Sequence, residues 1–133
     1  MLIQIARVLL VLDALIFVFV GYTLWTRPMA MTNLGMELVA PVGVTAIRTW
    51  GAFFLGAGLI GLIGAARRDW IPLGLGAVFI IGALVVTARL YGIAVDGTEE
   101  KQISELTDES LGPLLAGLGL LLVWLHKRRN RTS

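Results

Sequence analysis

Long apolar segments alternate with short polar ones along the whole chain. The apolar segments cover about residues 2–25, 44–66, 70–95 and 110–126, and each approaches or exceeds the roughly 17 to 25 residues that a helix needs to cross a bilayer. Backbone polar groups find no water in hydrocarbon, and the segments lack the alternation of membrane β-strands, so we expect helices. The pattern predicts an all-α integral membrane protein, a bundle of four transmembrane helices forming a single domain over residues 1–133.

The first apolar segment also has features of a secretory signal. However, it continues to Trp25, contains Asp13, and is followed by Thr26-Arg27-Pro28 without a small-residue cleavage site. Signal peptides have a shorter apolar region and a small-residue site. We therefore expect this segment to remain as the first span.

The polar segments at the two predicted membrane surfaces differ in charge. Basic residues follow the second and fourth spans and belong on one side: Arg67, Arg68, Lys127, Arg128, Arg129 and Arg131. The opposite segments are rich in Asp and Glu and have only Arg27 and Lys101 as basic residues. Because cytoplasmic loops carry the excess of Lys and Arg, both termini are predicted to be cytoplasmic.

The two predicted outer loops differ in character. Residues Arg27 to Pro41 are too apolar for a solvated loop, and we expect either a short interfacial helix or a structured connection that caps the bundle. Residues Asp96 to Glu109 are the most polar stretch of the chain. They are predicted to form a solvated acidic loop, in which Thr98 could cap a short helix.

Three charged residues lie well inside the predicted spans: Asp13, Arg48 and Arg89. A charge at the centre of a membrane helix costs roughly 2.5 to 3.5 kcal/mol on insertion scales, so each needs a partner, a water-filled cavity or a function. Arg48 and Arg89 fall in the outer half of the bundle, and Asp13 lies near the middle of the first span. Arg89 and Asp96 share one face of the third span, so their side chains could be neighbours.

These charges allow three interpretations. One is a structural network that pairs Asp13, Arg48, Arg89, Asp96 and Glu37 across the bundle, because paired charges are how membrane interiors usually tolerate such residues. Another is a site for an anionic or polar amphiphile, with Arg48 and Arg89 as a clamp. The third is ion- or proton-coupled transport, with Asp13 as the carboxyl group that exchanges a proton.

Composition excludes several kinds of site. The chain has no cysteine, and His126 is its one histidine, which excludes disulfides, thiolate metal sites, iron–sulfur clusters and a bis-histidine haem within one chain. Ser104, Ser110 and Ser133 lie on a predicted loop, a span edge and a terminus, so no catalytic triad can be assembled. The acids of residues 96–109 lack the spacing of a calcium loop. We expect no catalytic residue, no metal and no cofactor.

The second span opens with Ile47-Arg48-Thr49-Trp50-Gly51-Ala52 and continues through Gly56-Ala57-Gly58-Leu59. The third span ends with Ala88-Arg89-Leu90-Tyr91-Gly92-Ile93-Ala94-Val95-Asp96-Gly97. With these motifs, residues 5–125 resemble a family of small bacterial four-span membrane proteins catalogued as a domain of unknown function, and more distantly the DoxX-like four-helix membrane proteins. The family often shows a glycine pair where this chain has Gly51-Ala52. The resemblance implies the fold and a bacterial inner membrane, without a particular activity.

Small residues recur at helical spacing on two spans. They are Ala57, Gly61 and Ala65 on the second span, and Gly112 and Ala116 on the fourth. Helices in lipid associate through close backbone approach at small residues. We expect these residues to pack within the bundle, the alternative being a contact between two copies.

The expected function is that of a non-catalytic accessory or scaffold protein that packs against membrane lipids or the subunits of a larger membrane complex. Nucleic acid is not expected as a partner, because the basic residues gather at the predicted membrane edges, where anionic headgroups explain them. One alternative is a small ion-coupled or amphiphile transporter that uses Asp13. Another is a lipid-binding protein that uses Arg48 and Arg89.

Overall fold

Helices make up nearly all of the computed structural model, which describes residues 1–29, 40–97 and 100–130. In order they are α1 (Leu2–Thr26), α2 (Ala40–Ala66), the short 3-10 helix η2 (Arg68–Trp70), α3 (Ile71–Asp96) and α4 (Glu100–Arg129). The four long helices are each long and apolar enough to cross a membrane, and the described residues include no strand. The predicted all-α bundle of four transmembrane helices is confirmed.

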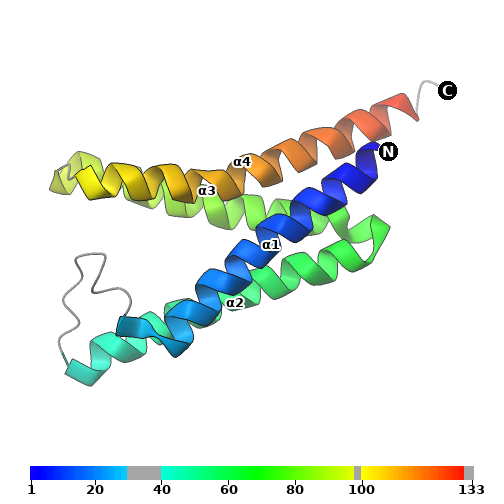
Figure 1. Ribbon diagram of the computed structural model, residues 1–133. Helices are drawn as coiled ribbons and strands as arrows, with labels where there is room; N and C mark the ends of the chain where they lie inside the picture. Colours follow the sequence, from blue (N-terminus) through cyan, green and yellow to red (C-terminus); the bar gives the residue numbers. More distant parts are fainter. Residues whose placement is uncertain (30–39, 98–99, 131–133) are drawn as a thin grey trace.

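The helices form two hairpins that pack on each other. α1 packs chiefly on α2, and α3 chiefly on α4, while α1 also contacts α4 and α2 contacts α3. The two chain termini and η2 lie at one end of the bundle, which we call the terminal end (Figure 1). The junction of α3 with α4 lies at the opposite end, the loop end, toward which the two hairpins separate (Figure 1).

Local backbone chemistry fixes both ends of α3. Pro72 lies in the first turn, where the missing N–H of proline has no helical partner to lose. Gly97 follows the last helical residue with φ of 103°, a conformation that glycine adopts without the steric cost of a side chain. The chain therefore leaves α3 at Asp96 and returns as α4.

Close backbone approach holds α1 against α2. A Cβ atom added at Gly58 would lie 2.7 Å from the Ala14 carbonyl oxygen, and one added at Gly51 would lie 2.6 Å from the Trp25 backbone nitrogen. Such contact between backbones is what allows membrane helices to associate without a hydrophobic driving force. The small residues of α2 that were predicted to pack within the bundle are all buried: Ala57, Gly61 and Ala65.

The start of α4 differs from the sequence prediction. A solvated acidic loop was expected through Glu109, with a span from Ser110, but α4 is already helical from Glu100. The residues of this stretch include Glu, Lys, Gln and Leu, which are good helix formers, so polarity alone was a poor guide. The loop prediction was wrong, and the helical extension places Glu105 and Glu109 on one face of α4.

Apolar side chains cover the outside of the bundle, as expected for contact with lipid. Large examples from each long helix are Phe19, Phe53, Leu73 and Leu114, all of which are strongly exposed. The interior is small and is built around Leu10, Leu75 and Val78. Most of the segment predicted as an interfacial helix, and Thr98, lie outside the described residues.

Candidate functional site

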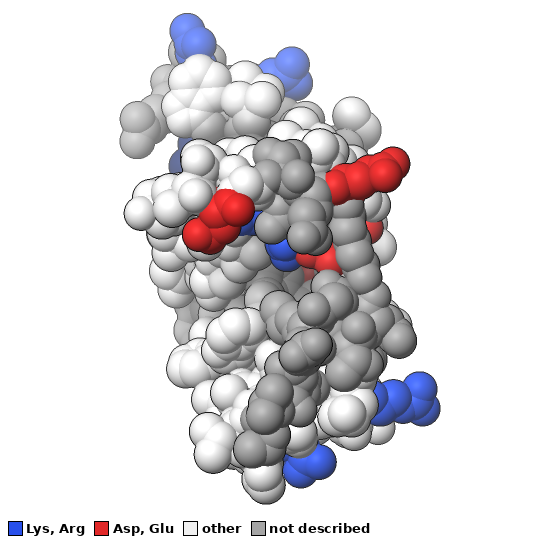
Figure 2. Space-filling view, turned by 90° about the vertical axis from the view of Figure 1, so that its left-hand side faces the viewer, with Lys and Arg blue, Asp and Glu red and all other residues white. Residues whose placement is uncertain are grey.

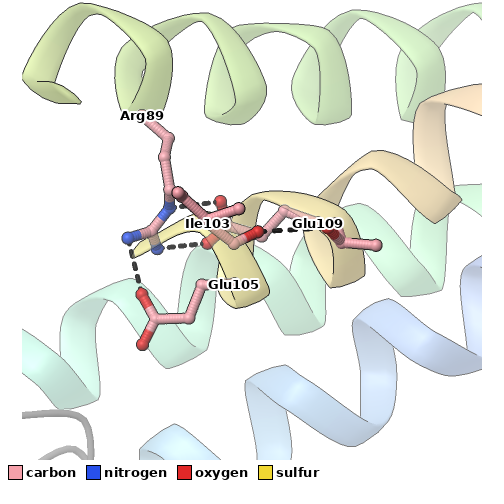
Figure 3. A network of polar contacts seen from close by, with 5 residues as sticks. Arg89, Ile103, Glu105 and Glu109 are labelled. Atoms are coloured by element: carbon pink, nitrogen blue, oxygen red, sulfur yellow. Dashed lines mark hydrogen bonds and ion pairs between the residues drawn. The ribbon is translucent and has the colours of Figure 1, made fainter. Parts of the chain in front are cut away.

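Arg89 of α3 is held by two glutamates of α4 (Figure 3). Its Nε donates to Glu109 Oε2 at 2.6 Å and its Nη2 to Glu109 Oε1 at 2.5 Å, while its Nη1 lies 2.6 Å from Glu105 Oε2. The pairing with Glu109 is bidentate, which is the strongest common geometry between a guanidinium and a carboxylate. The three side chains are about a quarter exposed, so water screens this cluster less than a surface pair.

The partners of Arg89 differ from the predicted one. Asp96 is exposed at the end of α3, and its Oδ2 lies 3.8 Å from the place where a Cβ would stand on Gly92. Sequence reasoning missed Glu105 and Glu109 as partners because it placed them in a loop. The available signal was their spacing of four residues, which brings two carboxylates to one helix face.

Arg48 does not join this cluster. It is exposed on α2, and within the described part of the chain it has no hydrogen bond or ion pair. α2 packs chiefly on α1, in the other hairpin, and no described contact joins Arg48 to Arg89 or to its glutamates. Glu37 and Arg131 lie outside the described residues.

Asp13 lies apart from the ion-pair cluster and is completely buried on α1. Neither carboxyl oxygen has a hydrogen-bond partner among the described residues. Its Oδ1 faces α4, where a Cβ added to Gly112 would lie 3.1 Å away. The missing side chain at Gly112 thus makes room for the carboxyl group, although leaving a buried polar group unsatisfied costs roughly 1 to 3 kcal/mol.

An apolar pocket with a volume of about 250 Å³ lies beside Asp13, between the two hairpins. All four long helices contribute to its walls, which include Phe17, Val20, Phe54, Val85, Gly112 and Pro113. Phe17 and Phe54 contact each other across α1 and α2, with ring centroids 5.7 Å apart. Gly112 lines the pocket, and a Cβ added to it would lie 3.1 Å from Asp13 Oδ1, so the carboxyl group of Asp13 lies close behind this part of the pocket wall.

One known family matches most of the chain. A family model described as a domain of unknown function (DUF4345) matches residues 5–104. The chain belongs to this family. The matched range contains Asp13, Arg48 and Arg89, and it ends just before Glu105, the first of the two glutamates that hold Arg89. No curated protein and no solved structure matches the chain.

Acidic side chains gather at the loop end of this DUF4345 protein. Figure 2 looks at that end and shows them around a basic side chain on the part formed by the α3–α4 hairpin. The described acids on this hairpin are Asp96, Glu100, Glu105, Asp108 and Glu109. Two of them, Asp108 and Glu109, also line the pocket, so the pocket has apolar walls and an acidic edge.

Basic and aromatic side chains gather at the terminal end. The Arg67 guanidinium lies 4.7 Å from the Trp70 ring centroid, and that of Arg128 lies 5.4 Å from the Trp124 ring centroid. Both distances suit cation–π contacts. Tryptophan and arginine together are typical of a membrane–water interface.

Proposed function

We propose that this DUF4345 protein is a non-catalytic membrane protein that binds an amphiphile in the pocket between its two hairpins. The observation that carries the proposal is Asp13, a completely buried carboxyl group without a partner in the described chain, directly behind an apolar pocket wall. Buried polar groups are normally hydrogen-bonded, and an exception calls for a specific explanation. A ligand that reaches past Gly112 and binds the carboxyl group of Asp13 provides this explanation.

The charges around the pocket favour a cationic head on that amphiphile. Asp108 lies at the edge of the pocket and Asp13 lies behind its wall, whereas the charge of Glu109 at the same edge is balanced by Arg89. The guanidinium of Arg89 is already engaged by carboxylates, and Arg48 is on the separate hairpin. An anionic lipid clamped by two arginines, one of the interpretations drawn from the sequence, is therefore the less favoured ligand.

Calorimetric titration of the purified protein with decyltrimethylammonium tests this proposal, with decyl sulfate as the anionic comparison. We expect saturable binding of the cation and about tenfold weaker binding after Asp13→Asn, equivalent to about 1.4 kcal/mol. Asp69→Asn removes an exposed carboxylate at the terminal end and serves as the matched control. Equal binding by the wild type and Asp13→Asn, or preference for decyl sulfate, would contradict the proposal.

Transport of the bound cation is a second candidate function, favoured by the position of Asp13 near the middle of its span. Intramembrane carboxyl groups that exchange protons are typical of coupled transporters. The test is proton-driven uptake of decyltrimethylammonium into liposomes that contain the protein. Absence of uptake in the wild type, or uptake unchanged by Asp13→Asn, removes this candidate while leaving simple binding in place.

An accessory or scaffold role, with membrane lipids or other membrane subunits as partners, stays a prediction from the sequence. It is supported by the apolar outer surface of the bundle. Extraction of the protein from its native membrane in mild detergent should then yield a heteromeric assembly or a tightly held lipid. A clean monomer that carries neither would contradict this role.

We further infer a bacterial inner membrane as the location, with the terminal end in the cytoplasm. The basic residues of the terminal end and the acidic residues of the loop end support this orientation through the positive-inside rule. The distant likeness to DoxX-like proteins likewise stays a prediction.

A further inference from the structure

A second pocket lies at the terminal end, away from Asp13, and it combines polar donors with an apolar wall. Its volume is about 410 Å³. The apolar part comes from Ile3, Pro72 and Val123, which belong to three different helices. The polar part is supplied by η2, the last turn of α4 and the residue after it, namely Arg68, Asp69, His126, Lys127 and Asn130.

A direct contact joins the two polar elements of this pocket. Arg68 Nη2 lies 3.2 Å from His126 Nε2, and Asn130 Nδ2 lies 3.4 Å from the same nitrogen. A guanidinium offers only donors, so Nε2 of His126 accepts in this contact. The contact uses one N–H group of Arg68 and leaves its other N–H groups to serve a further acceptor. Lys127 lines the same pocket.

The donors of this pocket suit a phosphate group. Arg68 and Lys127 supply positive charge, the Asn130 amide supplies a neutral donor, and among the described residues Asp69 is the one carboxylate that lines the pocket. Guanidinium and ammonium groups are the usual ligands of phosphate oxygens. The nearby Arg67–Trp70 contact combines residue types that are typical of the depth of lipid headgroups, which favours a lipid as the carrier of the phosphate.

We propose that this terminal-end pocket binds a phosphate group, with the headgroup of an anionic phospholipid as its natural carrier. The apolar wall then contacts the upper part of the acyl chains, while Arg68 and Lys127 bind the phosphate oxygens. His126 is a positioning residue that acts through Arg68. The proposal does not depend on the amphiphile pocket, which lies beside Asp13 between the hairpins.

The test is the thermal stability of the full chain in neutral detergent, measured with added phosphatidylglycerol, phosphatidylcholine or inorganic phosphate. Phosphatidylglycerol is expected to raise the unfolding temperature saturably and phosphatidylcholine to have little effect. A saturable rise with inorganic phosphate alone would identify free phosphate as the source and would also support the site. Equal effects of the two lipids, or no saturable effect of either anion, would overturn the proposal.

Substitutions distinguish binding in a specific pocket from attraction of the lipid by general surface charge. Arg68→Gln and Lys127→Gln should each remove about half or more of the phosphatidylglycerol effect. Arg67→Gln is the matched control, because it removes the same charge from a residue that stacks on Trp70 and does not line the pocket. Equal losses in all three variants would overturn the proposal.

Two substitutions of His126 test its positioning role. His126→Gln keeps an acceptor for Arg68 and should retain most of the phosphatidylglycerol effect, whereas His126→Leu should lose it. A purely structural role would show as a loss of stability without lipid, with the lipid effect unchanged, and this result would overturn the role of His126.

Discussion

The guanidinium of Arg89 meets two carboxylates of the neighbouring helix inside a membrane span. Removing one member of a shielded ion pair lowers stability by more than the intact pair contributes, because the remaining charge is left without a partner. Asp13 presents the opposite situation, since it has no compensating partner in the described chain. The two residues should therefore respond to substitution in opposite ways.

Loss of the Arg89 charge should destabilise the bundle. We expect Arg89→Gln to lower the free energy of unfolding by about 1 to 3 kcal/mol, below the cost for a fully buried pair because these side chains are partly exposed. The measurement is reversible unfolding in mixed micelles. Arg48→Gln, at an exposed arginine of α2, is the control and should change stability by less than about 0.5 kcal/mol.

A double variant checks that the effect comes from the pair. Arg89→Gln combined with Glu109→Gln should cost less than the sum of the two single changes, since each removes the same interaction. Strictly additive losses would argue against the ion pair as the cause.

Substitution of Asp13 should stabilise the protein. In Asp13→Leu two methyl groups replace the two carboxyl oxygens, and we expect the free energy of unfolding to rise by about 1 to 3 kcal/mol because an unsatisfied polar group is removed. Unfolding in the absence of added amphiphile provides the measurement. Asp13→Ala controls for overpacking against Gly112, and a loss of stability in both variants would show that the carboxyl group supports the fold.

At the scale of the helices, glycine positions decide how closely α1 and α2 approach. Gly58 lies against the Ala14 carbonyl oxygen, whereas a Cβ added at Gly56 would meet nothing within 4 Å. The two glycines are two residues apart on α2 and point to different surroundings. They form a matched pair for testing the helix contact.

Alanine at Gly58 should force α1 and α2 apart. We expect Gly58→Ala to destabilise the protein by about 1 to 3 kcal/mol, the usual range for overpacking, while Gly56→Ala leaves stability unchanged or slightly improved. Unfolding of both variants in the same micelles measures the difference. Similar effects of the two substitutions would mean that helix propensity, rather than contact with Ala14, sets the outcome.

The sequence predicts the helices well and the site only in part. Span length and apolar composition are local properties, so α1, α2 and α3 could be located from them. The partner of Arg89 depends on where α4 begins, and the polar residues after Glu100 gave no hydropathy signal for a helix. The burial of Asp13 depends on Gly112, nearly a hundred positions away, and only the packing of α1 on α4 brings them together.

At the scale of the whole molecule, the two ends of the bundle carry different chemistry. The terminal end presents arginines stacked on tryptophans, and the loop end presents the acids of the α3–α4 hairpin (Figure 2). This polarity is what an oriented membrane protein needs, because translocation retains positively charged segments in the cytoplasm.

The absence of cysteine in the sequence allows this orientation to be measured directly. Single substitutions Ser104→Cys and Asn130→Cys, both at exposed positions, mark the loop end and the terminal end. A membrane-impermeant maleimide should label Ser104→Cys in intact spheroplasts and Asn130→Cys only after permeabilisation. The reverse pattern would invert the proposed topology.

The pairing of Arg89 with Glu105 and Glu109 also bears on how the chain enters the membrane during synthesis. α3 emerges from the ribosome before its counter-charges, and an arginine inserted alone into a membrane helix carries an energetic cost. The bidentate contact offsets that cost only once α4 is present beside α3. The last two helices are therefore expected to leave the translocon together, as one hairpin, with the ion pair formed before either helix meets lipid on all sides.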